Sequence, residues 1–401
     1  MGSGGSGGGG PADGARRSLT SAARVLEQGS PGNRILTVTL ALGLAALILV
    51  GLPEMWRAFP AGIDLNIPLY AASRWSTHTQ PYPPAAMAVG SHELPYLYPP
   101  FLLPFLAPIA GLPRGLVDNV WLLLGDACAV WTCRRIGLPW IAVPFALAWP
   151  PYAEGLLTGN VQIWSFAAFA ALFCESRGGV LRRRALDPGR DLLNGVLAAS
   201  VGALKVAQSL PLLFLMRERR AAVVAGVVAL ATVTIVTLPL VGPAAYADWI
   251  AQLRRAADPT WSWTIGGVAP GKFLHTPDVL FTAIAVAITL SVRGRDTVAW
   301  LGIALVLVSP SVHGYTFLFL LPALLTIRRD AALLIAFLFL GNYLAVNWWT
   351  GAAATAGLMV AMNRWTWLRV AEPEPRSGEA WPAGPGRLRL VIRRGLTTAL
   401  R

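Results

Sequence analysis

Asp64 is the first residue of this chain whose type and setting suggest chemistry. It lies in the stretch AGIDLNIPLY, about ten residues after the first long apolar run. A carboxylate at a membrane surface can act as a general base and take a proton from a sugar hydroxyl. A carboxylate near a helix start is also a common structural feature. The sequence leaves both interpretations of Asp64 open.

Lys205 is the second candidate, because it stands alone in the apolar stretch VGALKVAQSLP. An ionisable side chain at membrane depth is costly and indicates a functional site. A lysine ammonium is a natural partner for the phosphate of a lipid. The alternative is a lysine whose long stem lets its charge reach the interface. We favour the functional interpretation of Lys205.

Three further motifs carry polar or aromatic side chains between apolar runs. PYLYPPF contains Tyr98 and forms either a rigid aromatic rim or an ordinary interfacial belt. GNVQ places Asn160 and Gln162 at a helix start, where their amides bind sugar hydroxyls or cap the helix. SPSVHGY contains His313 and Tyr315; this histidine binds phosphate, orients a base or is structural.

The elements that position these residues are predicted to be membrane helices. Of the 401 residues, 55% are hydrophobic and only 13% are charged, whereas soluble domains carry about a quarter charged residues. The net charge of +13 does not indicate nucleic-acid binding, because the arginines lie in short clusters between apolar runs. Such clusters are typical of the cytoplasmic side of membrane proteins.

This charge bias predicts about a dozen crossings with both termini in the cytoplasm. Residues 1–34 form a basic N-terminal segment, residues 35–363 the transmembrane catalytic domain, and the segment between the first two spans lies outside. The proline-rich segment 96–115 is predicted to be re-entrant or interfacial on the outer side, which keeps the later arginine clusters inside. The predicted spans are Ile35–Pro53, Leu116–Thr132, Leu138–Tyr152, Val161–Glu175, a helical pair or broken helix over 192–216 around Lys205, Ala221–Val241, Val279–Val292, Val298–Pro310, Phe317–Ile327, Ala331–Trp349 and Ala352–Met362.

The predicted inner and outer loops differ in composition. Inner loops hold arginines, whereas outer loops hold the varied polar residues, among them Asp64, Glu154 and His313. This asymmetry places the function on the extracytoplasmic face. The cytoplasmic tail, residues 364–401, ends in GRLRLVIRRGLTTALR, whose apolar residues follow helical spacing. We expect this helix to lie on the inner leaflet or to dock a cytoplasmic partner; the alternative is a disordered basic tail.

The order of these motifs resembles glycosyltransferase family 87 of the GT-C superfamily. The matching features are Asp64 in the first outer loop, Y-x-Y-P-P-F, the GNVQ turn, K-x-x-x-S-L-P-L-L ending in R-E-R-R, and S-P-x-x-H-x-Y. The resemblance implies an all-α polytopic GT-C-type bundle of about 12 transmembrane helices in the plasma membrane. It also implies a donor sugar carried on a polyprenyl phosphate and contact of the protein with membrane lipids. The reaction would need no cofactor and no metal.

The resemblance further implies a role for each candidate residue. Asp64 would be the catalytic base, and Lys205 and His313 would hold the donor phosphate. The substrate-binding residues would be Tyr98, Asn160, Gln162 and Tyr315. The expected reaction is inverting transfer of a mannosyl residue to a lipid-linked or cell-envelope glycan. An arabinofuranosyltransferase of the same family is the close alternative, and a lipid-sugar flippase or transporter is the alternative from another class.

Overall fold

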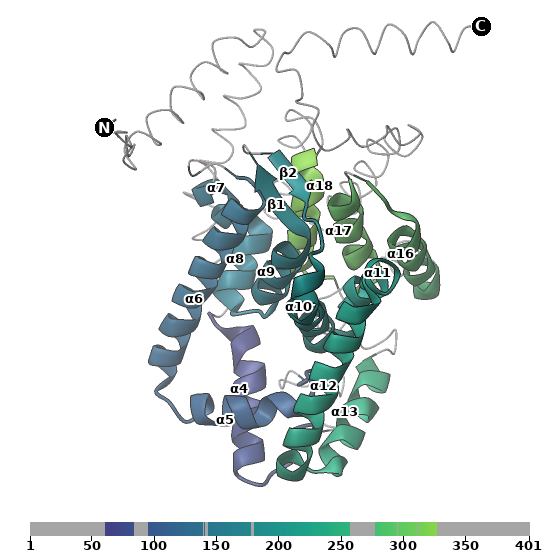
Figure 1. The fold of residues 1–401 in the computed structure, drawn as a ribbon. Coiled ribbons are helices and arrows are strands. Elements are labelled where there is room, and N and C mark those ends of the chain that lie inside the picture. The colour runs from purple at the N-terminus through teal and green to yellow at the C-terminus, as the bar shows by residue number, and fades with distance from the viewer. Residues whose placement is uncertain are drawn as a thin grey trace, which may run out of the picture. The chain divides into compact units, whose positions relative to one another are not determined.

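The computed structural model describes residues 61–83, 95–138, 140, 143–177, 180–256, 277–294, 296–310 and 312–326 (Figure 1). The first predicted span, the predicted spans after residue 330, the N-terminal segment 1–34 and the tail 364–401 lie outside these residues. The described residues form helices and one two-stranded hairpin. In chain order these are α4 (Ile63–Ser76), η3 (Pro100–Leu102), α5 (Leu103–Ala110), α6 (Arg114–Arg135), α7 (Val143–Ala148), α8 (Pro150–Thr158), α9 (Gln162–Phe173), β1 (Cys174–Arg177), β2 (Val180–Arg183), η5 (Pro188–Arg190), α10 (Asp191–Leu204), η6 (Val206–Gln208), α11 (Leu210–Glu218), α12 (Arg220–Val241), α13 (Pro243–Ala256), α16 (Asp278–Ser291), α17 (Thr297–Leu307), η7 (Gly314–Leu320) and α18 (Leu321–Thr326).

Two of the described helices, α6 and α12, are long and apolar enough to cross a membrane. They coincide with the predicted spans Leu116–Thr132 and Ala221–Val241. Only 28% and 17% of their most apolar windows are buried, so neither is the core helix of a soluble fold. Leu123 on α6 is 68% exposed and Ile235 on α12 is 66% exposed, which suits hydrocarbon rather than water. The total of about 12 crossings stays a prediction.

The proline-rich segment 96–115 does not form a spanning helix. Its helix α5 has eight residues, whereas crossing the hydrocarbon core takes about 20. The indole Nε1–H of Trp249, on α13, donates to the backbone carbonyl of Leu97 at 2.9 Å. This bond satisfies one carbonyl of the irregular backbone, as a non-helical segment at membrane depth requires. The predicted re-entrant placement agrees with the short helix, and its depth in the membrane stays a prediction.

The chain between α6 and α9 differs from the prediction. The predicted span Leu138–Tyr152 contains a break, because α7 ends at Ala148 and α8 begins at Pro150; its crossing of the membrane stays a prediction. Trp149 adopts extended backbone angles between them, as expected for a residue before proline. The predicted loop AEGLLTGN is wrong, because α8 continues to Thr158. The GNVQ turn thus follows a helix instead of a loop.

Two segments contain structure beyond the predicted elements. The predicted span over Val161–Glu175 ends as a helix at Phe173 and continues into a hairpin, in which Cys174 pairs with Arg183. The basic loop after residue 175 therefore begins as a strand. The predicted outer loop 243–277 begins with α13; its residues 257–276 lie outside the described part of the chain.

The predicted break around Lys205 is confirmed. The helix α10 ends at Leu204, Lys205 is extended with φ −143° and ψ 103°, and the short η6 leads into α11. Upstream of the break, α10 packs closely on α12 at two glycines. A Cβ atom on Gly195 would lie 2.0 Å from the carbonyl oxygen of Ala222, and one on Gly226 would lie 2.6 Å from that of Gly195. Only glycine at these positions allows the two backbones to approach this closely.

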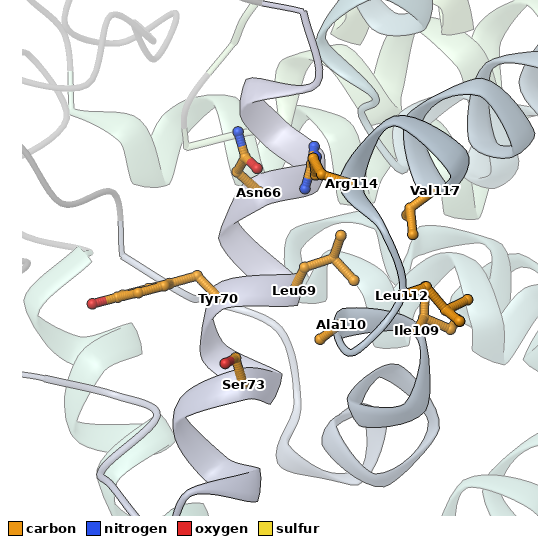
Figure 2. Close-up of a pocket in the computed structure, with 9 residues that line it drawn as sticks. All are labelled: Asn66, Leu69, Tyr70, Ser73, Ile109, Ala110, Leu112, Arg114 and Val117. Carbon is orange, nitrogen blue, oxygen red and sulfur yellow. The ribbon is translucent and has the colours of Figure 1, made fainter.

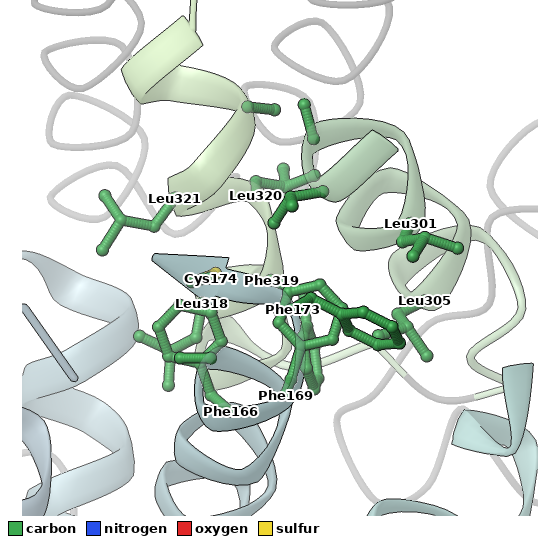
Figure 3. Packing of buried hydrophobic residues seen from close by; sticks show 14 of the residues in the cluster. Phe166, Phe169, Phe173, Cys174, Leu301, Leu305, Leu318, Phe319, Leu320 and Leu321 are labelled. Carbon is green, nitrogen blue, oxygen red and sulfur yellow. The ribbon is translucent and has the colours of Figure 1, made fainter. Parts of the chain in front are cut away.

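The main hydrophobic core contains a cluster of aromatic rings (Figure 3). Phe166 and Phe169 of α9 lie edge-on to Phe319 of η7, with ring centroids 5.6 and 5.4 Å apart. Leu301 and Leu305 of α17 pack into the same cluster. Such edge-to-face pairs add to the hydrophobic stabilisation. The core therefore fixes α9 against η7, and the beginnings of these two elements carry candidate residues.

Candidate functional site

Asp64 and Asn160 are hydrogen-bonded although they lie far apart in the sequence. Asp64 occupies the first turn of α4, so the helix-start feature is present. The Asn160 side-chain Nδ2–H donates to Asp64 Oδ2 at 2.9 Å. The Oδ1 atom of Asn160 accepts the backbone N–H of Gln162 at 2.8 Å, at the start of α9. Asn160 therefore binds the backbone at the first residue of α9 and orients the carboxylate of Asp64 at the same time.

The Lys205 ammonium lies over the ring of Tyr315, 4.7 Å from its centroid. This distance is within the range of a cation–π contact. The charge of Lys205 also interacts with the carboxyl groups of Asp64 and Glu154. Within the part of the chain that the structure describes, neither carboxyl comes within the 4.0 Å of a salt bridge with Lys205. The lysine therefore has an aromatic face on one side and acidic groups beyond contact distance.

Tyr315 joins these residues to the remaining predicted site residues. Its hydroxyl is a hydrogen-bond partner of the Asn160 side chain, and its ring stacks on His313 with centroids 5.2 Å apart. Burial raises the pKa of Tyr98, and the nearby charge of Asp64 raises it further. The structure thus brings Tyr98 and Tyr315 to the same cluster.

His313 is the N-cap residue of η7, and its backbone N–H donates to Thr316 Oγ1 at 3.1 Å. Burial, with the nearby charge of Lys205, lowers the pKa of the His313 imidazole to about 3. The ring is therefore neutral at physiological pH. A neutral imidazole can hydrogen-bond to a phosphate but cannot balance its charge.

Glu154 belongs to the cluster but received no role from the sequence. It lies on α8 with only 6% of its surface exposed, and the backbone N–H of Gly314 hydrogen-bonds its carboxyl group. A Cβ atom on residue 314 would lie 1.7 Å from Glu154 Oε2, so a glycine is required there. Burial, with the nearby charge of Asp64, raises the pKa of Glu154 to about 8. The one available signal was a single acid in the otherwise apolar run PPYAEGLL.

Gln162 points to a different partner from Asn160. It is fully buried, and its side-chain amide exchanges two hydrogen bonds with Gln208 of η6. The two bonds measure 3.3 and 3.2 Å. The predicted contact of Gln162 with a sugar stays a prediction, and its amide already has a protein partner here.

A groove of about 350 Å³ lies on another side of α4 (Figure 2). Because a helix turns by 100° per residue, the face of α4 that lines it is turned more than 120° from Asp64. The groove is therefore separate from the Asp64 cluster. The groove is lined by Asn66, Leu69, Tyr70, Ser73, Ile109, Ala110, Leu112, Arg114 and Val117.

The cluster combines the groups that a sugar transfer requires. A carboxylate held by an amide can accept a proton, a cation can bind an anionic leaving group, and tyrosine hydroxyls can bind a sugar. Most of these groups come from segments that the comparison with known families also matches. Residues 96–312 match the model of glycosyltransferase family 87. This range includes Tyr98, Asn160 and Lys205; Asp64 precedes it and His313 follows it directly.

No curated protein and no solved structure matches the chain. The family match nevertheless covers more than half of the 401 residues. It agrees with the order of motifs along the sequence and with the apolar helices α6 and α12. The chain belongs to glycosyltransferase family 87, and it is a glycosyltransferase.

Proposed function

We propose that this glycosyltransferase moves a mannosyl residue from a polyprenyl-phosphate donor to a lipid-linked or cell-envelope glycan, with inversion at the anomeric carbon. The reaction takes place on the extracytoplasmic face of the plasma membrane. The observation that carries the proposal is that Asp64, held by Asn160, and Lys205, over the ring of Tyr315, interact electrostatically, because a base and a cation are then available in one site. Family membership supports the transferase over the flippase considered from sequence.

In the proposed reaction Asp64 accepts the proton of the acceptor hydroxyl. The hydroxyl oxygen attacks the anomeric carbon from the side opposite the donor phosphate, and the new carbon–oxygen bond forms there. The bond between the anomeric carbon and the phosphate oxygen breaks, and its electron pair leaves with the polyprenyl phosphate. The hydrogen bond from Asn160 Nδ2 to Asp64 Oδ2 leaves the other carboxylate oxygen to face the acceptor.

Lys205 stabilises the charge that grows on the leaving phosphate. Such a preorganised charge in a water-poor site contributes a large part of many enzymatic rate enhancements. The Tyr315 ring under the ammonium holds it in place without neutralising it. The phosphate therefore finds a cation with no carboxylate in direct contact among the described residues.

A transfer assay in membranes tests the proposal. Membranes that contain the protein are incubated with radiolabelled polyprenyl-phosphate mannose or polyprenyl-phosphate arabinofuranose, and labelled glycan is extracted. We expect mannose to be incorporated and Asp64→Asn to reduce incorporation to background, because an amide cannot accept the proton. Incorporation of arabinofuranose alone would establish the alternative sugar.

Asp278→Asn is the matched control, because Asp278 also lies in the first turn of a helix. It should transfer mannose at the rate of the unmodified protein. Near-normal transfer by purified, folded Asp64→Asn protein would exclude Asp64 as the base.

A further inference from the structure

The broken helix at Lys205 is tied to α9 by hydrogen bonds. The backbone carbonyl of Lys205 accepts the N–H of Gln208 at 2.7 Å. The side chain of Gln208 then exchanges two hydrogen bonds with the side chain of Gln162. Both glutamines are at most 1% exposed, so the pair is shielded from competing water. Hydrogen bonds of this kind hold groups in place more firmly than exposed ones.

The same path continues from α9 to Asp64. The backbone N–H of Gln162 donates to Asn160 Oδ1, and Asn160 Nδ2 donates to Asp64 Oδ2. One chain of hydrogen bonds therefore joins the carboxylate of Asp64 to the backbone of Lys205, through Asn160, Gln162 and Gln208. Each of its links is between 2.7 and 3.3 Å.

We propose that the Gln162–Gln208 pair is a positioning element that fixes Lys205 relative to Asp64. The inference rests on the proposed function, in which Lys205 binds the donor phosphate and Asp64 accepts the proton. Lys205 is extended between the end of α10 and the three-residue η6, so it lies outside the regular backbone of either helix. The amide pair supports this segment from α9.

The need for such an element follows from the reaction. Transfer requires the acceptor oxygen at the base and the leaving phosphate at the cation to lie on opposite sides of one carbon. A small displacement of either group lowers the rate strongly. Two neutral amides can fix this separation without placing another charge beside the phosphate.

The test uses the full-length protein with Gln208→Leu, Gln162→Leu and the double variant. Binding of a short-chain polyprenyl monophosphate is measured by titration in detergent, together with the thermal unfolding midpoint and the rate of mannose transfer. Each single variant leaves one buried amide unpaired, so its unfolding midpoint should fall. Its affinity for the monophosphate should fall about tenfold.

The double variant separates positioning from stability. Replacing both partners by apolar groups removes the unpaired amide, so the unfolding midpoint should largely recover. The affinity and the transfer rate should stay low, because leucines pack without fixing a direction. If affinity and rate recover together with the midpoint, or if the single variants bind the monophosphate normally, the positioning role is wrong.

Two further variants complete the design. Thr289→Val removes a buried hydroxyl that bonds Ala285 within α16, and it should lower the midpoint without changing the affinity. Lys205→Ala should lose monophosphate binding. If Lys205→Ala loses monophosphate binding while Gln208→Leu binds normally, the positioning role alone is wrong. If Lys205→Ala binds the monophosphate normally, the proposed phosphate site is wrong.

Discussion

At the scale of single residues, Lys205 offers the clearest test of charge. Lys205→Ala should raise the KM for the polyprenyl-phosphate donor at least tenfold, on the order of 1.4 kcal/mol, because the phosphate loses its cation. Lys205→Arg should raise this KM much less, since its guanidinium keeps the charge. Steady-state kinetics with varied donor check this. Arg190→Ala, which removes an exposed cation, is the control; equal donor kinetics in Lys205→Ala and the unmodified protein would contradict the role.

Glu154 predicts a pH dependence of stability. Because burial raises its pKa from 4.5 to about 8, the folded protein holds this proton more tightly than the unfolded chain does. The resulting stabilisation is complete below a pH of about 4.5 and is lost as the pH rises through about 8. Glu154→Gln cannot ionise and lacks this dependence. Thermal unfolding measured from about pH 5 to about pH 9 should show a larger loss of stability in the unmodified protein; parallel curves would contradict the assignment.

Most residues of the cluster could be predicted from the sequence, because charges and amides between apolar runs are conspicuous. Asp64, Tyr98, Asn160, Lys205, His313 and Tyr315 do converge. The sequence did not distinguish Asn160 from Gln162, whose side chains hydrogen-bond to different residues. Their directions depend on the tertiary neighbours Asp64 and Gln208, which no local pattern specifies. Glu154 was named among the outer polar residues but received no role, because its close approach to Gly314 is a tertiary contact.

At the scale of elements, the crossing of α10 and α12 fixes the position of α10, and with it the position of Lys205, which directly follows α10. Gly195→Ala should lower stability by about 1–3 kcal/mol, because the added methyl group overlaps the backbone of α12. The displaced α10 should also weaken monophosphate binding. Gly115→Ala on α6 is the matched control, since a Cβ atom there meets nothing within 4 Å. Unfolding midpoints and titrations check both variants, and equal behaviour of the two would contradict the close contact.

The elements themselves were predicted unevenly. Long apolar runs gave α6 and α12, and the charge within an apolar run indicated the break at Lys205. The hairpin of β1 and β2 was missed, although two glycines at 178–179 between short stretches are a hairpin signal. The arginines of that stretch fit the inner-loop charge pattern equally well, which favours a loop over a strand. The α7–α8 break was missed because hydropathy alone ignores what Pro150 does to Trp149.

At the scale of the whole molecule, the tail 364–401, which the sequence predicts to be cytoplasmic, should be dispensable for chemistry. It lies outside the described residues, and its basic amphipathic pattern predicts attachment to an anionic leaflet. Deleting residues 386–401 should leave mannose transfer in detergent nearly unchanged, while binding of the protein to a cytoplasmic partner or anionic lipid is lost. Turnover by the purified truncated protein measures this. Loss of turnover in a folded truncated protein would contradict the predicted topology.

The distance along the chain between Asp64 and Tyr315 has a consequence for biosynthesis. Segments enter the membrane in the order of translation, with the N-terminal ones first. Asp64, Glu154 and Lys205 therefore arrive before Gly314 and Tyr315. Gly314 supplies the backbone donor to Glu154, and Tyr315 supplies the aromatic face to Lys205. During that interval a carboxyl group and an ammonium group lack their final partners in an apolar setting. A chain that stopped before residue 314 would keep Asp64 and Lys205 but lack Gly314 and Tyr315, and its unpaired charges would be costly in the membrane.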